Sequence, residues 1–268
     1  MFSNDVFFDY LNNNDIHGAM KYVEENVPDY LYKFYSLSDS DDELNRKKLD
    51  TLRSNSNWFD LVRNQNDPLD MQMAYIDETN KKVGQSAINC AKKMMTDMIN
   101  HLTICSFADT SERDLQMWAN YANKQQGYCV KYKINNKKVF YKVMYEDNRI
   151  PVLSIPLNLY TEIDKATKGN AEIEALNKYR YCFMLLFNIK HSSWRNENEY
   201  RILCPVCDHS GLNLSNESIG IKPVGIYLGL ECSDAHKSEL ESIAKDNLGC
   251  KCYDAFISDT KILDFKES

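Results

Sequence analysis

The sequence predicts an α+β fold, in which a mixed, largely antiparallel sheet is flanked by helices. Strand-like runs and helical patterns follow one another without the regular strand–helix–strand order of parallel α/β proteins. The chain also carries no glycine-rich phosphate loop and no internal repeat, so neither a P-loop fold nor a repeat architecture is indicated.

The composition is that of a globular protein. The 268 residues are 43% apolar and 26% charged, enough for one large domain or two small ones. A formal net charge of -7 argues against a protein that binds nucleic acid mainly by electrostatic attraction. The N-terminal segment lacks the basic start and apolar run of a signal peptide, and the longest apolar run, at 181–187, is too short to cross a bilayer. We therefore expect a cytoplasmic protein with no membrane partner.

The first elements divide the chain into two parts. Residues 5–26 have apolar side chains at helical spacing and predict one or two short helices. The run YLYKFYSL at 30–37 predicts a strand rich in aromatic residues. We expect an N-terminal helical extension over residues 1–29 and a single α+β domain over residues 30–268.

The middle of the chain mixes polar and apolar elements. Residues 39–53 predict a polar helix or loop, and residues 82–102 predict an amphipathic helix. The apolar run LTICSFAD at 102–109 predicts a buried strand. A compact helix at 114–126 is predicted to stop at Gly127.

The C-terminal half is predominantly strand-like. Residues 128–134 and 138–147 alternate in polarity and are separated by a short polar turn, which predicts an antiparallel hairpin. A long helix with an apolar end is predicted at 171–189. The remaining predicted elements are a strand at 199–204, a strand at 220–230, a helix at 233–249 and a strand at 251–259.

One strand concentrates the charged residues of chemical interest. Glu197, Glu199 and Arg201 occupy alternate positions, so in a strand they share one face. Tyr200 and Ile202 then point to the opposite face. This apolar face predicts a central strand whose charged face borders a cleft.

Two carboxylates in such a cleft have defined chemical uses. Their proximity raises the pKa of one of them. A carboxylate there can hydrogen-bond a substrate hydroxyl or stabilise an oxocarbenium-like sugar cation. The alternative interpretation is an ion-pair ladder on an exposed sheet edge, which would contribute less than about 1 kcal/mol.

Other polar and aromatic residues have two interpretations each. Trp118 and Tyr121 lie three apart on one helix face, as core residues do, and could also form a stacking wall for a base or nicotinamide. Asn66 and Asp67 stand directly before Pro68, where Asn and Asp favour the start of a turn, and could shape the rim of a cleft. Lys33 could bind a phosphate or remain a solvated lysine.

The nine cysteines stand mostly in apolar runs, as reduced thiols that pack like small hydrophobic residues do. Cys204, Cys207, Cys250 and Cys252, with His209 nearby, would be sufficient for a zinc site. The second pair has CxC rather than CxxC spacing, and both pairs lie in strand-like runs. We therefore expect core thiols and no metal site.

An ordered set of fragments carries a family resemblance. They are LYKFYSL, NDPLD, ICSFADTSERDLQMWANYANKQQGYCVKY, KVMYED, KHSSWRNENEYRIL and IYLG. The set resembles the bacterial family known as domain of unknown function 2971, with its Y-K-Y-x-S, F-N-D-P-F-D, M-W-x-x-Y-A, G-x-C and W-x-x-E-x-E-[WY]-R motifs. The resemblance spans residues 30–265. The chain departs from it at Gln65, where the family has phenylalanine, and at Tyr35, where an arginine suited to bind phosphate is common.

The fragment ENEYRIL is also distantly similar to a late motif of NAD-dependent ADP-ribosyltransferases. In those enzymes the second glutamate of an E-x-E contacts a ribose hydroxyl and stabilises the oxocarbenium ion as nicotinamide leaves. The similarity implies an ADP-ribosyltransferase-like fold with NAD as substrate, Glu199 as the catalytic carboxylate, Glu197 assisting the acceptor and Arg201 holding their geometry. The residues expected to face NAD are Tyr32, Lys33, Ser36, Asn66, Asp67, Trp118, Tyr121 and Trp194.

The resulting prediction is an NAD-consuming transferase or glycohydrolase, such as a bacterial toxin or phage-defence effector, with an unknown protein or nucleic-acid acceptor. One alternative is a Mg²⁺-dependent nuclease, whose ligands would be Asp67, Asp70, Glu197 and Glu199. Against the nuclease, Arg201 stands where such enzymes usually carry a lysine. Another alternative is a non-catalytic sensor or interaction module, which predicts no deep cleft beside Glu199.

Overall fold

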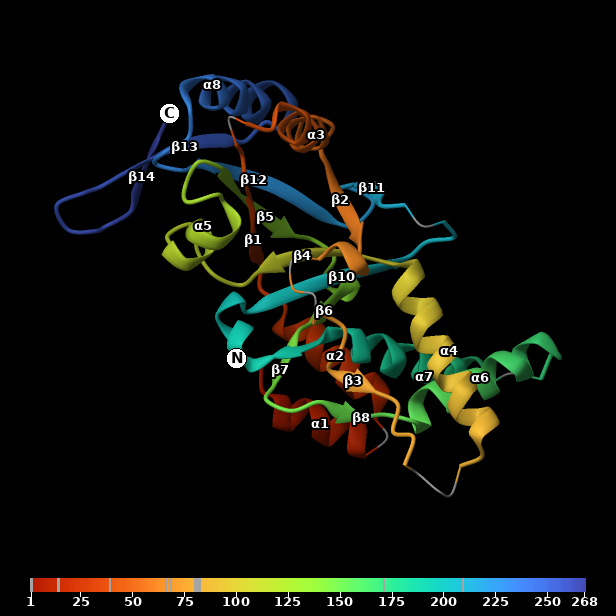
Figure 1. Cartoon of the computed structure of the whole chain (residues 1–268). Coiled ribbons are helices and arrows are strands. Elements are labelled where there is room, and N and C mark those ends of the chain that lie inside the picture. The colour runs from red at the N-terminus through yellow and green to blue at the C-terminus, as the bar shows by residue number, and fades with distance from the viewer. Residues whose placement is uncertain are drawn as a thin grey trace.

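The computed structural model describes residues 2–13, 15–38, 40–65, 67, 69–79, 83–170, 172–208 and 210–268. A ten-stranded sheet lies at its centre, and helices surround the sheet (Figure 1). Most neighbouring strands of this sheet are antiparallel, while β12 and β13 are parallel. The predicted α+β fold with a mixed, largely antiparallel sheet is confirmed.

Eight strands form the continuous path of the sheet. In spatial order they are β11 (Leu212–Ser215), β2 (Ser56–Leu61), β4 (Leu102–Ala108), β1 (Tyr30–Tyr35), β5 (Tyr128–Ile134), β12 (Ile221–Leu228), β13 (Lys251–Phe256) and β14 (Asp264–Glu267). Two further strands, β10 (Glu199–Pro205) and β6 (Phe140–Lys142), extend from β4 off this path. Two small parallel pairs complete the strands: β3 (Ala74–Tyr75) with β8 (Ile150–Pro151), and β7 (Met144–Glu146) with β9 (Ile189–His191).

Strand β4 is the branching point that positions the site. It pairs with β10 along its whole length. It also pairs with β2 near Ile104 and with β1 only at the Tyr32–Ala108 register. Because β1 leaves β4 after this single register, space opens between the two strands next to Ser106 and Phe107.

The helices fall into groups around the sheet (Figure 1). They are α1 (Asn4–Asn12), α2 (Ile16–Asn26), α3 (Asp42–Arg53), α4 (Gln85–His101), α5 (Leu115–Tyr121), α6 (Ser154–Thr167), α7 (Ile173–Leu185) and α8 (Asp234–Ser242). Helix α8 continues as a π-helix over Ile243–Leu248 and ends at Gly249 in the left-handed conformation, as its predicted stop requires. No helix of the described residues is long and apolar enough to cross a membrane.

The apolar residues pack in three clusters. The largest includes residues of α1 and α2, namely Phe7, Ala19 and Val23, together with Tyr200 and Ile202 of β10. A second cluster lies among α4, α6 and α7, and a third surrounds α5. The N-terminal helices thus share the main core, and the predicted division at residues 29 and 30 stays a prediction.

Two sequence-based expectations about elements are wrong. The predicted hairpin does not form, because β5 pairs with β1 and β12 whereas β6 pairs with β10. A short 3₁₀ turn at Lys137–Val139 redirects the chain between them. The long helix predicted to reach residue 189 ends earlier: α7 stops at Leu185, and a 3₁₀ turn leads into β9.

Helix α5 is also shorter than predicted. It ends at Tyr121, and Asn123, Lys124 and Gln125 follow with positive φ angles of 46°, 52° and 70°. Gly127 does not cap it, but a Cβ at this position would lie 1.9 Å from the carbonyl oxygen of Tyr35. The glycine therefore allows a close backbone approach between the start of β5 and the end of β1.

Candidate functional site

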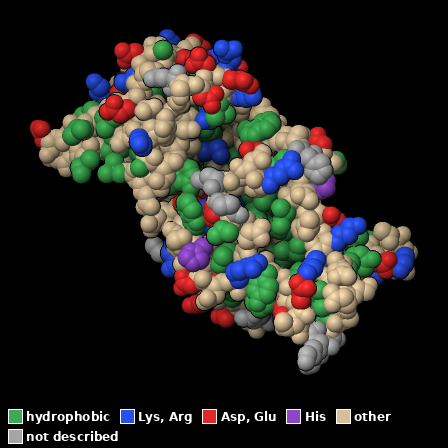
Figure 2. Space-filling model, viewed as in Figure 1, with side chains coloured by type: hydrophobic (Ala, Val, Ile, Leu, Met, Phe, Trp, Pro, Cys, Tyr) green, Lys and Arg blue, Asp and Glu red, His purple; other side chains and the backbone are tan. Residues whose placement is uncertain are grey.

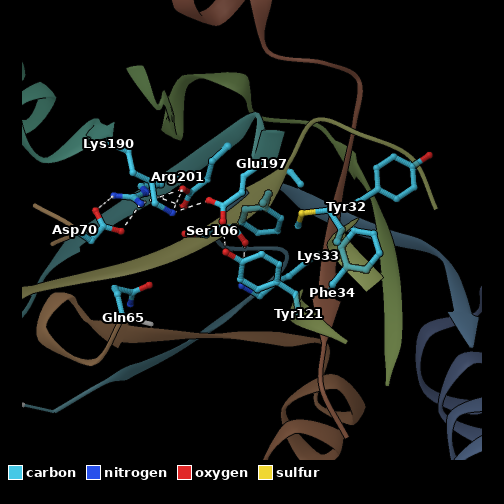
Figure 3. A pocket seen from close by; sticks show the side chains of 14 residues that line it. Tyr32, Lys33, Phe34, Gln65, Asp70, Ser106, Tyr121, Lys190, Glu197 and Arg201 are labelled. Carbon is cyan, nitrogen blue, oxygen red and sulfur yellow. Dashed lines mark hydrogen bonds and ion pairs between the residues drawn. The ribbon is translucent and has the colours of Figure 1, made fainter. Parts of the chain in front are cut away.

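A cavity of about 200 Å³ occupies the space where β1 and β4 separate (Figure 3). Lys33 of β1 bridges this space, because its Nζ donates a hydrogen bond of 3.0 Å to the Ser106 carbonyl oxygen of β4. Figure 3 shows Asp70, Lys190, Glu197 and Arg201 on one side of the cavity and the aromatic rings of Tyr32 and Phe34, with Lys33 beside them, on the other. The lining residues are Tyr32, Lys33, Phe34, Gln65, Asp70, Ser106, Phe107, Ala108, Met117, Tyr121, Lys190, Glu197, Glu199 and Arg201.

Arg201 is the fixed centre of the charged side. Its side chain is only 1% exposed. Its guanidinium binds the Asp70 carboxylate through two bonds of 3.0 and 2.6 Å, and its Nε donates to Glu199 Oε1 at 2.7 Å. This planar, bidentate geometry fixes both carboxylates relative to β10.

Glu199 is held in its ionised form. It is the first residue of β10 and is 5% exposed. Burial alone would raise the pKa of its carboxyl, but the positive charges of Arg201 and Lys190 and a hydrogen bond from Ser106 together lower this pKa to about 2.

Glu197 lies in a different electrostatic situation. Lys190 Nζ lies 2.6 Å from its Oε2, and the Tyr121 hydroxyl donates to its Oε1. Burial nevertheless raises the pKa of this carboxyl above its ordinary value, against the effect of Lys190. The cavity therefore contains two neighbouring carboxylates whose pKa values are shifted in opposite directions.

The structure corrects how Glu197 reaches the cavity. The sequence pattern placed it on the strand face of Glu199 and Arg201, but it ends a 3₁₀ helix, Ser192–Glu197. Asn198 then adopts the left-handed conformation with φ 44°, and its side chain donates to the Asp109 carbonyl. This turn, rather than strand alternation, brings Glu197 beside Glu199. The opposite face of β10 packs in the main core, as predicted.

Three residues expected to face NAD line this cavity, namely Tyr32, Lys33 and Tyr121. Trp118 does not line it, which corrects the expected stacking wall. Its ring is fully buried, meets the Phe34 ring edge-on at 5.3 Å between centroids, and donates from Nε1 to the Glu112 carbonyl. It is a core residue, the other interpretation of its spacing.

The remaining expected residues lie around the cavity. Lys190 Nζ lies 4.8 Å from the centroid of the Trp194 ring, in a cation–π contact. Trp194 itself lines an adjoining hollow. Ser36 accepts a hydrogen bond from Lys48 and does not line the cavity. Asp67 is buried and accepts from the Leu69 amide in a turn. Asn66 lies outside the described residues.

Sequence reasoning missed several lining residues. Lys190 and Ser106 were not identified, and Asp70 entered only as a metal ligand of the nuclease alternative. Lys190 offered one signal, because it is the single charge at the end of LLFNIK, a run that is apolar apart from Asn188. Its partners Glu197 and Glu199 are local in sequence, but its direction depends on the β7–β9 pairing, which no local pattern reveals.

Few side chains of the described residues near this cavity are arranged as metal ligands. Among the described residues, no three His, Cys, Asp or Glu side chains are grouped as metal ligands would be. Asp70 and Glu199, two of the nuclease ligands, both bind the Arg201 guanidinium. The thiols of Cys204, Cys207, Cys250 and Cys252 are not in disulfides, and His209 lies outside the described residues.

Comparisons with known proteins give one match. No curated protein and no solved structure matches the chain. The model of a family described as "Protein of unknown function (DUF2971)" matches residues 117–202, the segment that supplies Tyr121, Lys190, Glu197, Glu199 and Arg201 to the cavity. Over these residues, the chain is therefore similar to a family whose description names no activity.

Proposed function

We propose that this cavity cleaves the N-glycosidic bond of NAD, as an ADP-ribosyltransferase or NAD glycohydrolase does. The observation that carries the proposal is the pair of carboxylates, one held ionised and one with a raised pKa. Opposed pKa shifts in neighbouring acids are the usual basis for dividing charge stabilisation and proton transfer between them. Glycosidic chemistry requires this division of roles.

Glu199 would stabilise the charge that develops during bond cleavage. As the bond between the nicotinamide nitrogen and the ribose anomeric carbon breaks, its electron pair leaves with neutral nicotinamide. Positive charge then spreads over the anomeric carbon and the ring oxygen. A buried, ionised carboxylate stabilises such a cation strongly, because little water screens it. Arg201, fixed by Asp70, acts as a positioning residue for Glu199.

Glu197 would prepare the acceptor. The acceptor, water or a hydroxyl of a protein or nucleic acid, forms the new bond to the anomeric carbon and gives its proton to ionised Glu197. A carboxylate with a raised pKa is a stronger base than an ordinary one. Tyr121 and Lys190 orient this carboxylate through their contacts with its two oxygens.

The dimensions of the cavity suit the reacting end of the dinucleotide. A volume of about 200 Å³ is below the roughly 300–1,000 Å³ typical of pockets that enclose a whole ligand. Nicotinamide would lie against Tyr32 and Phe34, with its ribose toward the carboxylates. Such an NAD-consuming activity would suit a toxin or phage-defence effector, since NAD depletion harms the cell.

The test is release of nicotinamide from NAD by the purified chain. Glu199→Gln keeps the size and hydrogen-bonding ability of the side chain but removes its charge, and should slow release by roughly 10²–10³-fold. Glu197→Gln should slow the step by a comparable factor through loss of the proton acceptor. The matched control is Glu162→Gln, a buried glutamate of α6 that does not line the cavity, and it should retain activity. Nicotinamide release that is unaffected by Glu199→Gln would remove this residue from the reaction.

A further inference from the structure

A second and larger cavity adjoins the first. It has a volume of about 900 Å³ and lies between helix α3 and strands β1 and β2. Figure 2 shows this part of the surface hollowed below α3, with lysine and hydrophobic side chains near its edge. Lys33 lines both cavities, and its side chain lies between them with its Nζ on the Ser106 carbonyl oxygen.

Trp58 provides a large aromatic surface in the second cavity. Ser56, Trp58 and Asp60 alternate along β2 and line the cavity, while Phe59 points to the core. The Trp58 side chain is 48% exposed, a high value for tryptophan. A Cβ on Gly211 would lie 2.1 Å from indole Cζ2, so only a glycine at this position leaves room for the ring.

Lysines surround the same space. Lys47 and Lys48 of α3 line the cavity together with Lys33 of β1. Lys48 Nζ donates to both the carbonyl and the hydroxyl of Ser36, at 2.7 Å each, and burial lowers its pKa. These hydrogen bonds fix its ammonium group in place.

The acidic residues of this cavity are held by neighbouring groups. Asp50 pairs with Arg53, and Asp60 accepts hydrogen bonds from Asn64 and the Leu61 amide. Lys47 pairs with Glu43 at 2.8 Å, so Lys33, Lys48 and the Trp58 indole are the groups that give this site its basic and aromatic character. This combination binds nucleotides, because every base has a face that stacks on an aromatic ring and phosphates attract ammonium groups.

We propose that this α3–β2 cavity binds the adenosine diphosphate half of NAD. The base stacks on Trp58, the diphosphate lies near Lys33 and Lys48, and the remaining ribose and nicotinamide pass Lys33 into the carboxylate cavity. The choice of NAD rests on the proposed function. The volume of 900 Å³ lies within the range of small-molecule pockets, whereas the first cavity alone is too small for the dinucleotide.

The test uses ADP, which lacks the part of NAD that would be cleaved. Titration calorimetry on the full chain should show ADP binding, and ADP should inhibit nicotinamide release competitively. Trp58→Ala should weaken ADP binding at least tenfold, whereas Trp58→Phe, which retains a stacking ring, should largely preserve it. The matched control is Tyr160→Ala, an aromatic residue of α6 that is 50% exposed and lies outside the cavity, and it should bind ADP normally.

A second variant, together with separate assays of ADP binding and NAD cleavage, distinguishes the nucleotide site from the proposed function. Lys33→Met should also weaken ADP binding, with folding of every variant checked by circular dichroism. ADP binding without any NAD cleavage would overturn the proposed function and leave the nucleotide site standing. NAD cleavage with no ADP binding, and with a KM for NAD unchanged by Trp58→Ala, would overturn the nucleotide site alone.

Discussion

The charged residues of the carboxylate cavity form a buried network rather than independent pairs. Arg201 contacts Asp70 and Glu199, and Lys190 contacts Glu197 and Glu199. Removing one member of a buried ion pair leaves its partner desolvated, which typically costs about 3–5 kcal/mol. The network is therefore costly to disturb at any one of its members.

The pH dependence of stability should report directly on Glu199. Its pKa falls from an ordinary 4.5 to about 2 in the folded chain, so the folded state binds fewer protons than the unfolded state between these values. The stabilisation is complete above about pH 4.5 and disappears as the pH falls to about 2. A shift of this size corresponds to roughly 3 kcal/mol.

Urea unfolding of the wild type and of Glu199→Gln at several pH values measures this contribution. The difference in unfolding free energy between the two proteins should shrink as the pH falls from about 5 toward 2. The contribution of Glu197 to the pH dependence of stability has the opposite sign, because the pKa of its carboxyl is raised. Its protonated form favours the folded state, and the benefit is lost as the pH rises through its folded pKa. A constant difference between wild type and Glu199→Gln would show that Glu199 is not held ionised.

For the individual residues of the cavity, the sequence predicted part of the arrangement. Strand alternation placed Glu199 and Arg201 on one face, and this is how the structure arranges them. Asp70 could not be paired with Arg201 in advance, because 131 residues separate them. Glu197 entered the cavity through a left-handed residue, Asn198, whose conformation the strand interpretation did not include.

Among the elements, the close approach of β5 to β1 depends on a single glycine. Gly127→Ala would place a Cβ 1.9 Å from the Tyr35 carbonyl oxygen, a backbone atom that cannot move alone. We expect a loss of about 1–3 kcal/mol in unfolding free energy, measured by urea denaturation. Gly84→Ala is the control, because a Cβ there meets nothing within 4 Å, and its effect should stay within about 1 kcal/mol. Equal effects for the two variants would contradict this account.

Helices and strands were predicted correctly where the hydrophobic periodicity was strong. The prediction failed where the partner of a strand depends on tertiary structure. The strand at 30–37 and the helix at 233–249 were expected from local patterns, and β1, α8 and its π-helical continuation occupy them. The hairpin between β5 and β6 was wrong because both segments alternate correctly but pair with distant strands. Alternation reports which face is buried, and it carries no information about the neighbouring strand.

At the level of the whole molecule, the sheet and the N-terminal helices form one packed unit. Phe7 of α1 and Ala19 and Val23 of α2 lie in the same cluster as the apolar face of β10. The Tyr200 hydroxyl also donates to the Asn26 carbonyl oxygen at 3.0 Å. The strand that begins with Glu199 is thus supported from behind by the N-terminal helices.

Deleting residues 2–26 should therefore prevent cooperative folding of the remainder, because it exposes the apolar face of β10 and removes several fully buried side chains. Loss of that much core is comparable with the roughly 5–15 kcal/mol of stability available to a typical domain. Thermal unfolding followed by circular dichroism measures the effect. Point variants of α2 separate burial from length: Val23→Ala should cost about 2 kcal/mol or more, whereas Met20→Ala, on the exposed face, should cost little. If the shortened chain unfolded cooperatively at the wild-type temperature, the helices would be an appendage, and the position of Glu199 would have to be maintained by the sheet alone.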